Sequence, residues 1–194
     1  TYKKTSTPEQ NKVKNSVSDL DFIKDEKAFI PASNIDNYVP ERAGYYCIRI
    51  KNINELPDFF SRELEKRGHN ILYIGLASKS LKKRMLNQEL RAKGHGTFFR
   101  SIGAVLDFRP QRGSLSGKKS KNYKFNLTDQ HKIIQWINEN LIVHWTTVDF
   151  VDNNEETSLI HQHKPLLNIA KNPLSLNAIE SLRKECLDIA RAQN

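Results

Sequence analysis

The chain has 194 residues, of which 38% are hydrophobic and 9% aromatic, enough for one domain with a buried core. No apolar run approaches the roughly 18 residues of a transmembrane helix, so we expect a cytoplasmic protein without a membrane span. Cys47 and Cys186 lie far apart in the sequence, which argues against a disulfide framework and fits a reducing compartment.

Positive charge is concentrated in one part of the chain. The net charge is +9, and residues 79–124 alone carry thirteen Lys or Arg against two Asp or Glu. A basic stretch of this kind is typical of a surface that binds a polyanion such as a nucleic acid. The alternative is a solvated loop that lysines keep soluble.

The N-terminal half alternates short strands with helical patterns. Residues 1–43 are expected to form an N-terminal arm, mobile over 1–17 and irregular but packed over 18–43. The pattern then predicts a strand over 45–50, a helix over 55–67 that Gly68 ends, and a second strand over 71–75.

Downstream of the second strand the pattern is mainly helical. Residues 79–91 have a helical apolar side, and Gly94-His95-Gly96 interrupts this pattern. Residues 98–106 are expected to form a short helix or a turn that packs on the core. We expect a basic Gly/Ser-rich loop over 109–124, then a helix capped by Thr128 and a strand over 141–150. The next helix should start at Asp152 or Asn153 and end near Lys164, because Pro165 follows. A final helix should begin with an Asn177–Glu180 capping pair.

Four segments in this order resemble the signature of the GIY-YIG nuclease family. They are Gly44-Tyr45-Tyr46, Tyr73-Ile74-Gly75, Leu81 to Arg84, and Glu156 to Ile160 followed by Pro165 and Asn168. The similarity covers residues 44–168, roughly two thirds of the chain. Three features depart from the family pattern: Tyr45 stands where Ile or Val is usual, residues 51–70 insert a helix between the two strands, and residues 109–124 form the long basic segment.

The resemblance implies an α+β fold with a small, mainly antiparallel three-stranded sheet flanked by helices. We expect the nuclease-like domain to span residues 44–170, with insertions at about 51–70 and 109–124. Residues 171–194 would then form a C-terminal helix that packs on the domain.

The same resemblance assigns chemical roles. Tyr46 becomes the general base, Tyr73 orients the water, Arg84 binds the phosphate, and Glu156 is the metal ligand. Gly75 and Asn168 support the site. One carboxylate can suffice for Mg²⁺ (or Mn²⁺), because this ion keeps several waters and takes phosphate oxygens as ligands.

A tyrosine base carries an energetic cost. Ionising an ordinary tyrosine at pH 7 costs roughly 4 kcal/mol, so nearby cations or the metal would have to lower its pKa. The alternative is that metal-bound water is the base and Tyr46 only positions it.

DNA is the expected partner. Its predicted contacts are basic side chains of the positively charged stretch: Lys82, Lys83, Arg91, Lys93, His95, Arg100, Lys118, Lys119 and Lys121. The sequence thus favours a divalent-metal-dependent DNA endonuclease, of restriction type because no separate recognition domain is visible. The alternatives are a non-catalytic nucleic-acid-binding module on the same fold, a repair or mobile-element nuclease fragment, and a basic RNA-binding protein. A homodimer is expected if both DNA strands are cut.

Overall fold

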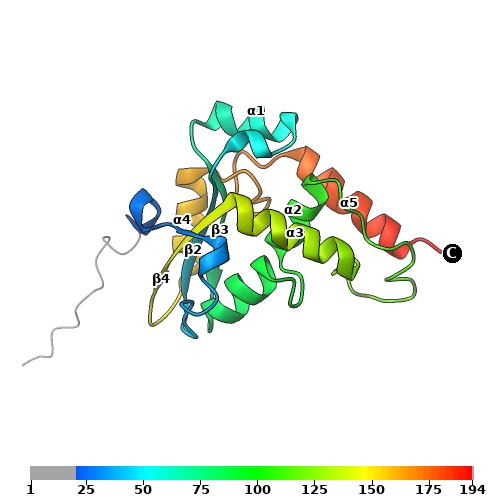
Figure 1. The fold of residues 1–194 in the computed structure, drawn as a ribbon, viewed down its shortest axis with the longest axis horizontal. Helices are drawn as coiled ribbons and strands as arrows, with labels where there is room; N and C mark the ends of the chain where they lie inside the picture. Colours follow the sequence, from blue (N-terminus) through cyan, green and yellow to red (C-terminus); the bar gives the residue numbers. More distant parts are fainter. Residues whose placement is uncertain (1–20, 194) are drawn as a thin grey trace, which may run out of the picture.

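The computed structural model describes residues 21–193 and shows a central antiparallel sheet with helices around it (Figure 1). The strands are β1 (Ile30–Pro31), β2 (Gly44–Ile50), β3 (Ile71–Ala77) and β4 (Leu141–Thr147), in the spatial order β1-β4-β2-β3. The helices of eight or more residues are α1 (Asp58–Arg67), η5 (Lys82–Leu90), α2 (Thr97–Val105), α3 (Leu127–Asn140), α4 (Asn153–His163) and α5 (Asn177–Arg191). Short 3-10 helices are η2 (Glu26–Ala28), η3 (Ala32–Asn34) and η4 (Ile53–Glu55). The α+β class is confirmed.

The sheet has four strands where the sequence predicts three. The additional strand, β1, has only two residues, Ile30 and Pro31, which pair with Val143 and Ile142 of β4. Pro31 lacks an N–H group and is tolerated because β1 lies at the edge of the sheet. A two-residue strand that contains proline has no alternating pattern to reveal it, which explains the missed prediction.

The described part of the predicted N-terminal arm packs on the domain. Phe22, Ile23, Ile35 and Val39 are buried, and Arg49 of β2 donates a hydrogen bond to the carbonyl of Ile23. From residue 21 onward this segment consists of short elements and turns that pack against the sheet. The mobile arm predicted for residues 1–17 lies outside the described residues.

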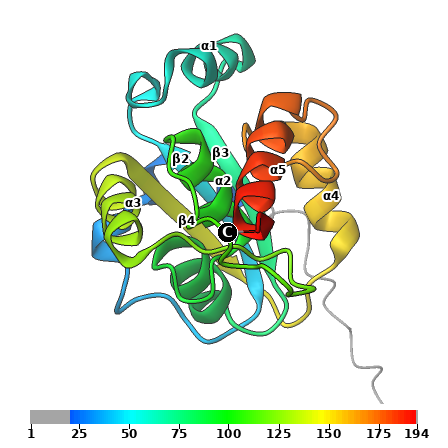
Figure 2. The same ribbon diagram turned by 90° about the vertical axis from the view of Figure 1, so that its right-hand side faces the viewer.

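Two apolar layers cover the two faces of the sheet. Because neighbouring side chains on a strand point to opposite faces, Tyr45 and Tyr46 of β2 belong to different hydrophobic clusters. Tyr45 packs with Leu159 and Ile160 of α4 on one face. Tyr46 faces the larger cluster, which includes residues of η5, α2, α3 and α5. Figures 1 and 2 show α4 on one side of the sheet and α2, α3 and α5 on the other.

Several predicted helix ends are confirmed, and two are corrected. Gly68 ends α1 in the left-handed conformation, and α4 ends at His163, just before Pro165. Asn126, rather than Thr128, caps α3 through the Asp129 amide.

The second correction concerns α5. The Asn177–Glu180 capping pair does not form, because Leu176 occupies the N-cap position and Asn177 is already helical. The strand predicted over 141–150 ends earlier, at Thr147.

The helix predicted over residues 79–91 is wound as a π-helix, η5 (Lys82–Leu90). Its first amides are held by the preceding chain, since Leu81 N donates to the Arg42 carbonyl and Lys82 N to the Pro40 carbonyl. The Ser80 hydroxyl accepts a hydrogen bond from Lys83 N. The wider i→i+5 winding changes which side chains share a face, with consequences for the site described below.

Among the described residues, no helix is long and apolar enough to cross a membrane.

Candidate active site

The Tyr46 side chain lies across Gly75 of the neighbouring strand. The two residues are directly paired between β2 and β3. A Cβ atom placed on Gly75 would come within 2.5 Å of both Cζ and Oη of Tyr46. Only glycine leaves room for the phenol here, so Gly75 supports the site by close approach.

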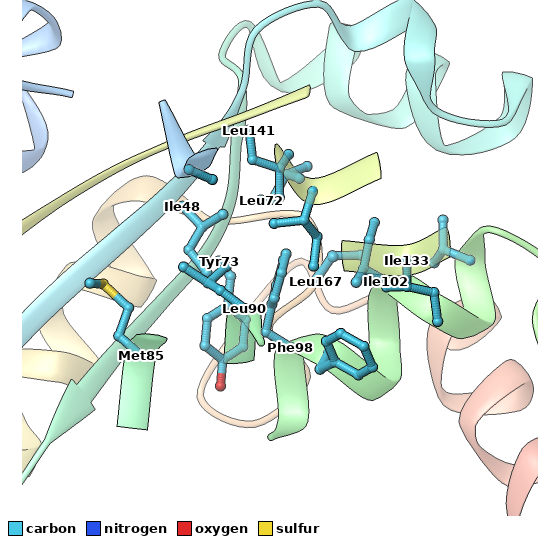
Figure 3. Packing of buried hydrophobic residues seen from close by; sticks show 14 of the residues in the cluster. Ile48, Leu72, Tyr73, Met85, Leu90, Phe98, Ile102, Ile133, Leu141 and Leu167 are labelled. Atoms are coloured by element: carbon cyan, nitrogen blue, oxygen red, sulfur yellow. The ribbon is translucent and has the colours of Figure 1, made fainter. Parts of the chain in front are cut away.

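Tyr73 stands two residues before Gly75 on the same face of β3. Its ring centroid lies 6.3 Å from that of Tyr46 and 5.7 Å from that of Phe98. Figure 3 shows the Tyr73 ring among core side chains and its hydroxyl oxygen at the edge of that cluster. Tyr73 also lines a pocket of about 450 Å³ that contains Glu156 and Asn168.

A carboxylate that the sequence analysis did not select adjoins Tyr46. Glu89 of η5 is fully buried, and its Oε1 lies 3.4 Å from the Tyr46 hydroxyl and 3.2 Å from Nη2 of Arg84. Its Oε2 accepts from the amides of Phe98 at 2.8 Å and Phe99 at 3.4 Å. These amides belong to the first turn of α2, where the helix dipole favours a negative charge.

The winding of η5 explains why Glu89 was missed. In an α-helix, residues five apart are separated by about 140° around the axis, so Arg84 and Glu89 would point in different directions. The i→i+5 winding brings them onto one face. No sequence pattern used above distinguishes the two windings.

Arg84 connects this buried pair with solvent. Its side chain is 38% exposed, donates to Gln88 at 3.0 Å and pairs with Glu89. It lines a second pocket, of about 460 Å³, together with Lys79, Lys83 and Glu156. A cationic pocket at which Arg84 is partly free is chemically suited to a phosphate group.

Glu156, and not its neighbour Glu155, reaches the pockets. Glu155 accepts a short hydrogen bond from the hydroxyl of Tyr45, which also receives a hydrogen bond from the Asp152 amide at 2.6 Å. Tyr45 thereby ties the start of α4 to β2. The next residue, Glu156, projects to the β3 edge and lines both pockets.

The Glu156 carboxylate is partly exposed and is paired with a lysine. The Glu156 side chain is 16% exposed, and its Oε2 lies 2.8 Å from Nζ of Lys171. Among the described residues, no group of three or more Asp, Glu, His or Cys is arranged to hold a metal. A lone carboxylate beside open pockets suits Mg²⁺, which binds through few protein ligands.

Asn168 secures the strand that carries Tyr73. Its Oδ1 accepts from the Ile74 amide at 3.0 Å, and its Nδ2 donates to the Ile74 carbonyl at 2.8 Å. Leu166 and Leu167 also donate backbone hydrogen bonds to β3. Because β3 is an edge strand, this segment satisfies backbone groups that would otherwise lack partners.

Burial controls the protonation of the tyrosine pair. Burial, followed by the charge of Glu89, raises the pKa values of both Tyr46 and Tyr73 above the ordinary value for tyrosine. Arg84 opposes both shifts. Burial also raises the pKa of Glu89, against the opposing effect of Arg84. Both phenols are therefore neutral at pH 7.

The predicted DNA contacts divide into exposed and internal residues. Exposed lysines are Lys83, Lys93, Lys118, Lys119 and Lys121, and Lys82 is partly exposed beside Glu41. Lys83 lines the pocket that contains Arg84, whereas the loop that holds Lys118 to Lys121 runs beside the C-terminal end of α5 (Figure 1).

Two of the remaining contacts are corrected by the structure, and a third is already engaged. His95 is 2% exposed, and its Nε2 accepts from the Phe125 amide. Burial, then Lys124, lowers the His95 pKa to about 4, so the ring is neutral and internal and does not face phosphate. Arg100 is buried against Tyr123 and bonds to Asn122, and Arg91 is paired with Asp36.

The largest pocket described, about 550 Å³, lies elsewhere, between α1 and the chain before α5, and contains none of the predicted site residues. It therefore adds nothing to the candidate active site.

Comparison with known protein families gives one match. A family model described as the GIY-YIG catalytic domain matches residues 44–186. The match begins at the first residue of β2 and extends into α5, so it includes Tyr46, Tyr73, Arg84 and Glu156. No curated protein and no solved structure matches the chain.

Proposed function

Because this chain belongs to the GIY-YIG nuclease family, we propose that it is a divalent-metal-dependent endonuclease that hydrolyses DNA phosphodiester bonds at specific sites, as restriction enzymes do. One observation carries the proposal. Tyr73, Arg84 and Glu156 come from three separate elements and line two pockets that share Glu156, and Tyr46 lies behind them across Gly75, linked to Arg84 through Glu89.

The pocket lined by Arg84 binds the phosphate. Lys79, Lys83 and Arg84 line it, and Arg84 offers a planar guanidinium that suits the paired oxygens of a phosphate. In the reaction, Arg84 stabilises the negative charge that develops on the phosphoryl oxygens. On this proposal the scissile phosphate lies between Arg84 and Glu156, which line the same pocket.

Glu156 is the residue that would hold Mg²⁺ or Mn²⁺. A bound divalent ion supplies Lewis-acid polarisation of the phosphate and stabilises the leaving oxygen. In this structure the Lys171 ammonium group forms an ion pair with the Glu156 carboxylate. Its ammonium group is exposed enough to move aside, since its side chain is 35% exposed.

The two tyrosines orient and deprotonate the attacking water. Tyr73 lines the pocket that contains Glu156 and orients the water there. Tyr46 receives the water proton, and its position is fixed by Gly75 below the ring and by Glu89 at the hydroxyl.

A non-catalytic DNA-binding module is the second candidate. Two observations favour it: the Tyr46 side chain is fully buried, and the Glu156 carboxylate is already paired with Lys171. A module of this kind would keep the basic surface and bind DNA without cutting it.

Cleavage of supercoiled plasmid with Mg²⁺, Mn²⁺ or EDTA separates the two candidates. We expect metal-dependent cutting that EDTA abolishes, and discrete fragments would indicate site specificity. Linear product formed in one step would support a homodimer, whereas nicked circles would indicate a single active site. Binding without cutting under every metal condition would favour the module, and preference for structured RNA would contradict DNA as the substrate.

A further inference from the structure

Glu89 links the two proposed site residues Tyr46 and Arg84 to the start of α2. It is completely buried, touches the phenol of the proposed base and the guanidinium of the proposed phosphate ligand, and caps α2. Burying a charge is costly unless it is paired, and two backbone amides and one arginine surround the Glu89 carboxylate.

Two glycines shape the space around this contact. A Cβ on Gly96 would lie 2.1 Å from Oε2 of Glu89, and a Cβ on Gly75 would lie 2.5 Å from Oη of Tyr46. Side chains at either position would push the carboxylate or the phenol out of place. The backbone is thus open at the two points that let Glu89 and Tyr46 approach each other.

Resting on the proposed function, we propose that Glu89 is a positioning residue of the nuclease reaction: it holds the Tyr46 hydroxyl as a donor and accepts its proton while Tyr46 takes a proton from the attacking water. Tyr46 then relays a proton and stays neutral throughout. A free tyrosinate, which burial disfavours, is never formed.

The proton and electron balance of this step is complete. The water oxygen forms a bond to phosphorus as its proton passes to Tyr46 Oη, and the Tyr46 proton passes to Oε1 of Glu89. The bond from phosphorus to the leaving oxygen breaks, and its electron pair stays on that oxygen, which takes a proton from solvent. Glu89 later returns its proton through Tyr46 to solvent.

The separation of 3.4 Å between Tyr46 Oη and Glu89 Oε1 exceeds the 2.5–3.0 Å usual for O–H···O bonds. Catalytic hydrogen bonds are often long in the absence of substrate and tighten in the complex. Arg84 supplies a reason for tightening here. On this proposal a bound phosphate draws Arg84 away from Glu89, and the Glu89 Oε1 atom then turns to its remaining side-chain donor, the Tyr46 hydroxyl.

A double-mutant cycle tests the relay against a purely structural role for Glu89. Glu89→Gln keeps an oxygen that can accept from the Phe98 amide but removes the proton-accepting charge. Cleavage rates at saturating DNA are measured for the native chain, Glu89→Gln, Tyr46→Phe and the double variant. DNA affinity is measured by fluorescence anisotropy, and the fold by urea unfolding.

The relay predicts that Glu89→Gln slows cleavage about 100-fold or more while DNA affinity changes less than about threefold. The double variant should be no slower than Tyr46→Phe, because residues that act as one unit are not additive. Cleavage by Glu89→Gln close to the native rate, or losses that multiply in the double variant, would overturn the relay.

If Glu89→Gln does not fold, the same cycle is run with Glu89→Asp, which keeps the charge but withdraws it from Tyr46. Near-native cleavage by Glu89→Asp, or losses that multiply in its double variant, would again overturn the relay. A native chain that cuts while Glu89→Gln cuts equally well refutes only the relay. A native chain that cuts nothing with any metal refutes the proposed function, and the relay with it.

Discussion

At the scale of single residues, the site depends on close contacts that tolerate little change. Tyr46 and Tyr73 are fixed by packing, Glu89 by hydrogen bonds, and Glu156 by its place in the first turn of α4. The sequence pattern singled out Tyr46, Tyr73, Arg84 and Glu156 as candidates but not Glu89. Their contacts could not be predicted, because these join residues far apart in the chain.

Gly75→Ala should disable the site with a modest loss of stability. The added methyl overlaps the Tyr46 phenol, and overpacking of this kind costs about 1–3 kcal/mol. We expect urea unfolding to show that loss and cleavage to fall by at least tenfold.

Gly68→Ala is the matched control for Gly75→Ala. Gly68 has φ of 70°, and a Cβ there would have no atom within 4 Å. It should cost about 1 kcal/mol through backbone strain alone and leave cleavage intact. Equal cleavage by both variants would show that Tyr46 need not lie across residue 75.

His95 should make the fold sensitive to acid. Its folded pKa is about 4, below the ordinary value of 6.5, so the unfolded chain binds the proton more readily between these values. Its contribution to stability is therefore present above about pH 6.5 and is lost as the pH falls towards 4, by at most about 3 kcal/mol. The charged groups that act on it are Lys124 and Arg100.

Urea unfolding at pH 7 and pH 5 measures this effect. His95→Gln should lose less stability than the native chain between these pH values. The exposed His131→Gln should behave as the native chain does. An identical pH dependence for His95→Gln and the native chain would contradict a buried, neutral His95.

At the scale of elements, local signals predicted most boundaries, and long-range contacts produced the exceptions. Gly68 and Pro165 mark helix ends through backbone geometry alone, and both predictions are confirmed. The strand β1 exists only because β4 offers it a partner. The π-winding of η5, which creates the Arg84–Glu89 pair, likewise has no local signature.

Asn168→Ala should loosen the β3 edge. It removes partners from both the amide and the carbonyl of Ile74, and each buried unsatisfied group costs about 1–3 kcal/mol. Hydrogen exchange should show faster exchange of the Ile74 amide, and the free energy of unfolding should fall. The exposed Asn37→Ala is the control. Unchanged exchange at Ile74 would show that Asn168 does not hold this strand.

At the scale of the whole molecule, the basic loop over residues 109–124 and the candidate active site are different parts of the protein. Three residues of the family signature, Tyr73, Arg84 and Glu156, line the two pockets beside β3. The sum of charges predicted a basic surface but not its layout, because His95 and Arg100 turn inward and Arg91 pairs with Asp36. Burial of these side chains follows from tertiary packing, which composition does not encode.

The basic loop should contribute binding energy that salt screens. Replacing Lys118, Lys119 and Lys121 by Gln should weaken DNA binding and reduce the slope of log affinity against log salt by about one per lost phosphate contact. In a control triple variant, Lys51, Arg62 and Lys66 are replaced by Gln, which removes the same charge from the 51–70 insertion. This insertion joins the C-terminal end of β2 to the N-terminal end of β3. Equal slopes for the two triple variants would show that the 109–124 loop is not a DNA contact.

The most direct test of the proposed active site compares metal-dependent plasmid cleavage by the native chain, Glu156→Gln and Glu155→Gln. The two substitutions remove the same charge from neighbouring residues, but only Glu156 lines the pockets. Glu155→Gln keeps an oxygen for the Tyr45 hydroxyl. We predict that Glu156→Gln abolishes cutting while DNA binding persists, and that Glu155→Gln cuts as the native chain does. Native-like cutting by Glu156→Gln would contradict the account.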